Sequence, residues 1–158
     1  MSSKFNNMTI YLGSDHAGFE LKEKIKEFLA DEGYDLEDMG PYRYNREDDY
    51  PDYALKVCKK VLMGGKGILI CGTGQGMDVV ANKIPGIRAA VCWDEITAMN
   101  AGKHLNTNVL TIGGRVTEPD LAKRIIKIWL DSPLTIEKRN ARRIDKIKGI
   151  EREYLRDK

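Results

Sequence analysis

The sequence lacks both an apolar run of membrane-spanning length and the apolar core of an N-terminal signal peptide. It also lacks an excess of charge of either sign, with 26 Lys and Arg residues against 24 Asp and Glu residues. A balanced charge argues against a dedicated nucleic-acid binder. These absences predict a globular cytoplasmic protein with neither a membrane nor a nucleic acid as its partner.

Cysteine and histidine are scarce. The three cysteines, Cys58, Cys71 and Cys92, are an odd number at spacings unlike those of a zinc knuckle, which is consistent with free thiols in a reducing compartment. The two histidines, His16 and His104, are too few for a histidine-rich metal site. We therefore expect no metal, and a chain of 158 residues is long enough for a single domain with its own hydrophobic core.

The stretch from Gly67 to Met77 joins a short apolar run to a cysteine and a glycine-rich turn. The run ending at Cys71 predicts a buried parallel strand, and the glycines of the turn, Gly72, Gly74 and Gly76, allow backbone amides to surround an anion. A helix that begins inside this turn would favour the thiolate form of the cysteine. The alternative is a small buried residue followed by an ordinary turn. The glycine spacing matches neither a Walker loop nor a dinucleotide fingerprint, so no nucleotide cofactor is expected.

Apolar runs and amphipathic segments alternate along the chain. The expected strands are Met8 to Gly13, Tyr34 to Met39, Gly67 to Cys71, Ile87 to Cys92 and Val109 to Ile112. The expected helices are Phe19 to Gly33, Pro51 to Gly64, Met77 to Lys83, Trp93 to Lys103 and Glu118 to Leu130. This alternation predicts an α/β protein, a Rossmann-like three-layer α/β/α sandwich with a five-stranded parallel sheet.

Polar residues follow several of the expected strands. Asp15 and His16 come directly after the first strand, at the sheet edge where ligands bind in open parallel sheets. Tyr50 stands where a polar loop meets a helix, and His104 lies in a polar segment before the last strand. Each residue also has a purely structural alternative: a helix N-cap for Asp15, a packing contact for Tyr50 and a satisfied loop histidine for His104.

The tail from residue 135 to residue 158 has a different composition. Basic residues interleave there with a thin apolar stripe, which predicts an extended C-terminal helix that packs against a partner subunit. Arg139 and Arg143 are one helical turn apart and can present two guanidinium groups to a single phosphate. The alternative is a solvated basic face without a ligand.

Six motifs, taken in order, resemble those of the B-type ribose-5-phosphate isomerases, a family that also includes galactose-6-phosphate isomerase. They are Ser14-Asp15-His16-Ala17-Gly18, Asp49-Tyr50-Pro51-Asp52-Tyr53-Ala54, Cys71 to Met77 with Ala81-Asn82-Lys83, Gly86-Ile87-Arg88-Ala89, His104 to Asn108, and Gly114-Arg115. The resemblance extends from Met8 to about Ile147. Its motifs are specific for the family and less specific for the substrate.

The resemblance implies a cofactor-free and metal-free aldose-ketose isomerisation through an enediolate. Cys71 matches the base that moves a proton between sugar carbons C1 and C2, and His104 matches the acid that helps open the furanose ring, with Asp15 alongside. The amides from Gly72 to Gly76, with Thr73 among them, match the hole for the enediolate charge. The residues implied in sugar or phosphate binding are His16, Tyr50, Gly72, Gly74, Gln75, Gly76, Leu105, Arg115, Arg139 and Arg143. Some of these contacts come, in the family, from the neighbouring subunit, which implies a homodimer or a dimer of dimers with the active site at the interface.

The sequence departs from the family pattern at several substrate contacts. Leu105 replaces an asparagine that follows the histidine, and Gln75 and Asp78 are polar where the family often has an apolar residue and a serine. Near Arg139 the local sequence also differs, so Lys138 and Arg142 are alternative phosphate ligands. These changes leave open a hexose 6-phosphate, such as galactose or allose 6-phosphate, or a tetrose phosphate as the substrate. Two further alternatives are a non-catalytic sugar-phosphate binding protein and a redox sensor in which Cys58 or Cys92 resolves an oxidised Cys71.

Overall fold

The computed structural model describes residues 8–135 and 137–155. Its sheet has five strands in the order β2-β1-β3-β5-β4, and every neighbouring pair is parallel. The strands are β1 (Thr9–Ser14), β2 (Asp35–Asp38), β3 (Lys66–Cys71), β4 (Ala89–Val91) and β5 (Val109–Gly113). The predicted parallel sheet is confirmed. The fourth strand is shorter than expected, because Ile87 and Arg88 belong to the connection before β4 and Cys92 lies after it.

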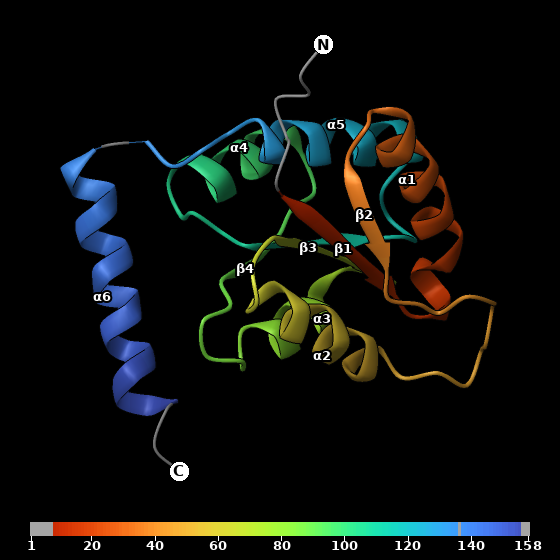
Figure 1. The fold of residues 1–158 in the computed structure, drawn as a ribbon, viewed down its shortest axis with the longest axis horizontal. Helices are drawn as coiled ribbons and strands as arrows, with labels where there is room; N and C mark the ends of the chain where they lie inside the picture. The colour runs from red at the N-terminus through yellow and green to blue at the C-terminus, as the bar shows by residue number, and fades with distance from the viewer. Residues whose placement is uncertain (1–7, 136, 156–158) are drawn as a thin grey trace.

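Helices cover both faces of the sheet (Figure 1). The helices are η1 (His16–Gly18), α1 (Phe19–Asp31), α2 (Tyr50–Val61), α3 (Gln75–Ala81), α4 (Glu95–Lys103), α5 (Pro119–Leu130) and α6 (Lys138–Tyr154). One face carries α1, α4 and α5, and the other carries α2 and α3. The predicted three-layer α/β/α arrangement is therefore confirmed. No helix in the described part of the chain has the length and apolar character needed to span a membrane.

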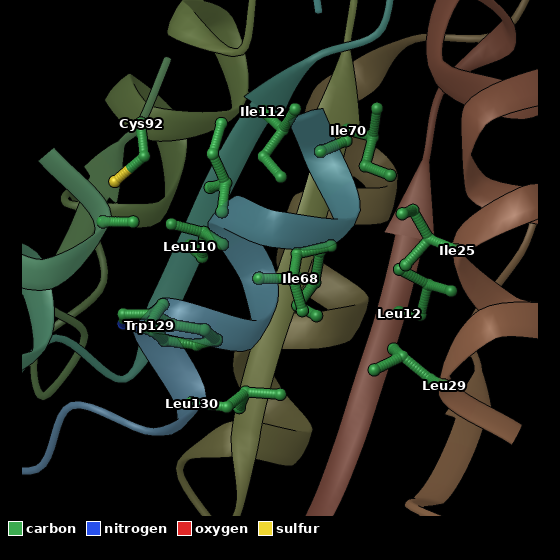
Figure 2. Packing of buried hydrophobic residues seen from close by; sticks show 14 of the residues in the cluster. Leu12, Ile25, Leu29, Ile68, Ile70, Cys92, Leu110, Ile112, Trp129 and Leu130 are labelled. Atoms are coloured by element: carbon green, nitrogen blue, oxygen red, sulfur yellow. The ribbon is translucent and has the colours of Figure 1, made fainter. Parts of the chain in front are cut away.

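The hydrophobic core lies on both sides of the central strands. Figure 2 shows the larger cluster, in which Trp129 and Leu130 of α5 lie near Ile68 and Leu110 of the sheet. The second cluster lies between the other sheet face and α2 and α3, and it includes Cys71. Because β3 is buried on both faces, its sequence is almost continuously apolar.

Local signals explain where several helices begin. Pro51 stands in the first turn of α2, where a missing backbone N–H costs nothing. The side chains of Asp94 and Thr97 form a reciprocal capping box at the start of α4. The third helix begins at Gln75, inside the glycine-rich turn, because Gly74 adopts a left-handed φ of 82° just before it. The glycine-rich turn between β3 and α3 therefore lies at the carboxyl edge of the sheet.

The predicted C-terminal helix is present as α6, and it lies outside the sandwich on the side of the edge strand β4 (Figure 1). It is held by few contacts. The Gly86 N–H donates to Glu151 Oε1 at 2.7 Å, and the Thr135 N–H donates to the Lys103 carbonyl at 3.0 Å. Most of the α6 surface is exposed, including Ile150 at 60%. This helix offers an extended basic and apolar surface.

Candidate active site

The candidate site is built around the carboxyl end of β3. The Gly114 N–H donates to the Cys71 carbonyl at 2.7 Å, and the Arg115 N–H donates to the Gly72 carbonyl at 3.0 Å. The Asp15 N–H donates to the Ile70 carbonyl at 3.2 Å. These hydrogen bonds bring the ends of β1, β3 and β5 to one place, as expected of neighbouring parallel strands.

Tyr50 and Arg115 lie on either side of the glycine-rich turn. A Cβ added to Gly76 would lie 2.9 Å from the ring of Tyr50, and a Cβ added to Gly72 would lie 3.3 Å from a guanidinium nitrogen of Arg115. At Gly76 a Cβ would clash with the Tyr50 ring, so glycine allows this close approach, whereas at Gly72 the contact with Arg115 would be tight. Tyr50 thus packs on the loop that follows Cys71, and it remains 40% exposed.

The other side chains of the turn differ in direction. Thr73 and Gln75 are exposed at the same edge. Asp78 instead faces β5, where it lies 3.4 Å from the hydroxyl of Thr111, and burial raises the pKa of its carboxyl. Thr73 and Gln75 therefore remain candidates for contact with a ligand, whereas Asp78 is engaged within the fold.

Cys71 differs from the other two cysteines in its place in the fold. All three thiols are free and buried, with Cys71 4% exposed at the end of its strand. Burial raises the pKa of Cys58 to about 12, and burial is also the main cause that raises the pKa of Cys92 to about 12. Thiols that stay protonated at neutral pH are poor resolving nucleophiles, which argues against the redox alternative.

Asp15 combines a structural role with a position in the site. Its Oδ1 accepts the Gly18 N–H at 3.0 Å, so the carboxylate caps η1, the structural alternative that the sequence suggested. Burial raises the pKa of the Asp15 carboxyl, and the hydrogen bond from Gly18 offsets only part of that rise. The Asp15 backbone lies beside the end of β3, where its N–H donates to the Ile70 carbonyl.

His16 is held by Asp48, a residue that the sequence did not single out. Asp48 Oδ1 accepts the His16 backbone N–H at 2.9 Å and lies 2.7 Å from Nδ1 of the imidazole. The two residues are 32 positions apart, and Asp48 sits within a run of acidic residues that has no distinguishing local pattern. Only the tertiary fold reveals the pair.

A hollow of about 610 Å³ lies next to His16 and Arg115, with Phe19 and Tyr44 among its other lining residues. Within residues 8–135 and 137–155, no carboxylate lies within 4.0 Å of the Arg115 guanidinium, whereas Arg124 pairs with Glu95. An unpaired arginine beside a histidine is suited to binding an anion such as phosphate.

Asp15, His16 and Asp48 also form a cluster whose polar atoms all lie within 4.8 Å of one another. Residues of these types can hold a metal ion. Both carboxylates already accept hydrogen bonds inside the protein, from Gly18 and from His16. These hydrogen bonds occupy one oxygen of each carboxylate and Nδ1 of the imidazole.

His104 and Leu105 lie at the opposite edge of the sheet from Cys71. They follow α4 and precede β5, and both His104 and Leu105 are exposed. The guanidinium of Arg88 donates to the carbonyls of Leu105 and Asn106 at 3.0 and 2.8 Å. Within one chain, the structure does not bring His104 together with Cys71 or Asp15. Arg88 is a second residue whose role the sequence did not reveal, although it lies in one of the quoted motifs.

The four basic residues at the start of α6 are likewise outside the Cys71 site. They are Lys138, Arg139, Arg142 and Arg143, and all are exposed. Arg139 lies 3.6 Å from Glu137, on the same helix end. The hydrogen bond between Thr135 and Lys103 joins the segment before α6 to the end of α4, so these basic residues belong to the His104 side of the molecule.

Known proteins resemble this chain over most of its length. The family model described as Ribose/Galactose Isomerase matches residues 10–147. Ribose-5-phosphate isomerase B of Escherichia coli is 42% identical over 145 residues, which cover 90% of this chain and 95% of that protein. The D-erythrulose-4-phosphate isomerase of Pectobacterium atrosepticum is 41% identical over 127 residues, covering 79% of this chain and 84% of the relative.

A solved structure gives the same result for the fold. The crystal structure of ribose-5-phosphate isomerase B from Mycoplasma genitalium with bound ribulose-5-phosphate superposes with a TM-score of 0.89 at 39% identity, covering 93% of this chain and 98% of that one. The matched region includes β1 to β5 and most of α6. The chain therefore belongs to the ribose/galactose isomerase family and is an isomerase of the ribose-5-phosphate isomerase B type.

Proposed function

We propose that the enzyme interconverts ribose 5-phosphate and ribulose 5-phosphate through an enediolate, with Cys71 as the base. The observation that carries the proposal is the position of Cys71 at the end of β3, where the glycine-rich turn lies between Tyr50 and Arg115. A basic group and a set of backbone donors at one place suit the removal of a proton next to a carbonyl.

In the proposed reaction, the Cys71 thiolate removes the proton from C2 of the open-chain aldose. The C–H electron pair forms the C1–C2 double bond, and the carbonyl oxygen becomes the oxyanion. Amides of the turn from Gly72 to Gly76, with the Thr73 hydroxyl, stabilise that charge, and such donors are typically worth about 3 to 4 kcal/mol each. After a proton passes from the C2 hydroxyl oxygen to the C1 oxygen, the thiol returns its proton to C1 and leaves a ketone at C2.

The turn can be tested by replacing Gly74 with alanine. A Cβ at Gly74 would lie 2.9 Å from the backbone of Ile112, and φ at this glycine is 82°. Gly33 has the same φ but nothing within 4 Å of its Cβ, so Gly33→Ala measures the left-handed strain alone, about 1 to 2 kcal/mol. We expect Gly74→Ala to lose more stability in urea unfolding and to lower kcat/KM at least tenfold, a barrier increase of about 1.4 kcal/mol. Equal stability losses and an unchanged kcat/KM would contradict this role for the turn.

We further propose that each active site contains residues of two copies of the chain. His104 acts in ring opening, yet it lies at the amino edge of the sheet, about 16 Å from Cys71 if five residues of β5 separate the edges at 3.3 Å each. A second copy that places its amino edge and α6 against the first would supply His104 and the α6 arginines together. The exposed surface of α6 supports this arrangement, and either a homodimer or a dimer of dimers provides it.

The phosphate is assigned to Arg115 of one copy with Arg139 and Arg143 of the other, and His16 is assigned to the sugar. Tyr50 and Gln75 line the sugar on the Cys71 side, and Leu105 does so on the His104 side. Lys138 and Arg142 are exposed on the same helix and remain the alternative phosphate ligands.

A different sugar phosphate is the second candidate substrate, and two observations favour it. Leu105 is 41% exposed beside His104 and offers no hydrogen bond from its side chain to a sugar hydroxyl, and one relative is named as acting on a four-carbon sugar phosphate. Relative kcat/KM values for ribose 5-phosphate, a hexose 6-phosphate and a tetrose 4-phosphate decide between them. We expect the highest value for ribose 5-phosphate. A tenfold or greater preference for a hexose or tetrose phosphate is equal to about 1.4 kcal/mol. That result would replace ribose 5-phosphate as the proposed substrate and leave the proposed mechanism unchanged.

A further inference from the structure

The acid Asp48 is unusual in the loop that connects β2 to α2. Most of residues 42–49 are exposed, yet the side chain of Asp48 is only 4% exposed and is turned onto His16. One of its oxygens, Oδ1, receives both the backbone N–H and the ring Nδ1 of His16, at 2.9 and 2.7 Å. Tyr44 of the same loop places its ring edge-on to the imidazole, with the ring centres 6.1 Å apart.

This contact determines which nitrogen of His16 carries the proton. A carboxylate only accepts hydrogen bonds, so a neutral imidazole that bonds to it must have its proton on Nδ1. The other nitrogen, Nε2, then bears a lone pair and can accept a hydrogen bond from a hydroxyl. With His16 23% exposed and Asp48 nearly buried, the ring is the member of the pair that a ligand can reach.

The pair is costly if its only purpose is to fasten the loop. The second oxygen of Asp48, Oδ2, is buried without a hydrogen-bond partner among the described residues. An unpartnered buried carboxylate oxygen costs free energy. A neutral asparagine with its amide oxygen at the Oδ1 position would accept both contacts with less desolvation. What the carboxylate adds is its charge, which makes it the stronger acceptor for Nδ1–H.

We propose that Asp48 is a positioning residue that holds His16 in the Nδ1–H form, with Nε2 free to accept a hydrogen bond from a hydroxyl of the sugar phosphate. The inference rests on the proposed function, because it assigns the ligand of His16 to that substrate. His16 and Arg115 line the same hollow, so a sugar hydroxyl at Nε2 would place the phosphate end near the guanidinium. Asp48 itself touches His16 and not the substrate.

The test uses Asp48→Ala in the full chain, with Asp49→Ala as the matched control, because alanine offers Nδ1 neither an acceptor nor a donor. Asp49 is the exposed neighbour, its side chain makes no capping hydrogen bond, and its replacement removes the same charge. Long-range proton–nitrogen NMR spectra report which imidazole nitrogen is protonated, and the chain has only two histidines, so a His104→Gln spectrum assigns the signals. We expect Nδ1–H for neutral His16 in the wild type and in Asp49→Ala, and in Asp48→Ala the Nε2–H form that a free imidazole favours.

Kinetics with ribose 5-phosphate provide the second readout. We expect Asp48→Ala to lower kcat/KM roughly 10- to 100-fold, the range seen when partners that orient metal-bound histidines are removed, while Asp49→Ala stays near wild type. Asp48→Glu, which keeps a carboxylate, should retain Nδ1–H and recover part of the activity. A wild-type ring protonated on Nε2 would overturn the inference whether or not any variant folds. A shifted proton in Asp48→Ala with unchanged kinetics would overturn the positioning role.

The two proposals fail in distinguishable ways. Absence of turnover from the wild-type chain on every sugar phosphate would contradict the proposed function, and with it the kinetic consequence assigned to Asp48. The tautomer of His16 is measured without substrate, so it tests the hydrogen-bond assignment separately from the reaction.

Discussion

Replacing Cys71 with alanine is expected to lower kcat/KM by roughly 10²- to 10⁴-fold, the usual contribution of a general base, while the protein still folds. Alanine cannot accept the C2 proton, and no other thiol can take over, because Cys58 and Cys92 lie in the core with pKa values of about 12. The loss of one buried sulfur atom should cost about 1 kcal/mol of stability. The measurement is steady-state kinetics beside a urea unfolding curve.

Cys58→Ala and Cys92→Ala are the controls for this variant. Each removes a buried thiol of the same size at a position away from the glycine-rich turn, with Cys58 in α2 and Cys92 after β4. We expect both to lose stability and to keep near-wild-type kcat/KM. If Cys71→Ala remained as active as these two variants, Cys71 would not be the base. A folded Cys71→Ala protein that still bound ribose 5-phosphate would assign the loss to the chemical step.

Mixing two inactive variants is expected to restore activity. If Cys71 of one copy works with His104 of the other, a mixed dimer of Cys71→Ala and His104→Gln has one site with both defects and one site with neither. Random pairing of equal amounts then gives about a quarter of the wild-type activity, because half of the dimers are mixed and each has one intact site. The measurement is turnover of ribose 5-phosphate after the two proteins have been unfolded and refolded together.

The matched control pairs Cys71→Ala with Arg115→Ala. Both residues lie at the carboxyl edge of the same chain, so every site of a mixed dimer carries one defect and no recovery is expected. Chains with different affinity tags establish that mixed dimers have formed. Inactivity of mixed Cys71→Ala and His104→Gln dimers would contradict the two-copy site, and the position of His104 would then need another explanation.

The layered fold could be predicted from the sequence because its signals are local. Apolar runs such as the one ending at Cys71 and amphipathic segments such as residues 119–130 alternate with little ambiguity, and the parallel sheet follows from that order. The same reasoning placed Asp15, Tyr50 and the glycine-rich turn at one edge, and the structure brings them together there.

Two side-chain contacts of candidate site residues, those of His16 and Leu105, could not be predicted from local sequence patterns. Asp48 meets His16 across 32 residues, and Arg88 holds the Leu105 carbonyl across 17, so each contact depends on tertiary packing and not on a local pattern. The separation of His104 from Cys71 did have a signal. A residue that precedes a parallel strand lies at its amino edge, whereas Cys71 ends its strand at the carboxyl edge.

The central claim, proton transfer by Cys71 through an enediolate, is tested most directly by proton NMR of the enzyme with ribose 5-phosphate in D₂O. A thiol that exchanges with solvent returns deuterium in place of the proton it removed, so we predict ketose carrying deuterium at C1 with the wild-type chain. With Cys71→Ala we predict that ketose forms roughly 10²- to 10⁴-fold more slowly. Ketose that forms without solvent deuterium would indicate direct or shielded transfer. Ketose that forms equally well with Cys71→Ala would contradict the assignment of the base.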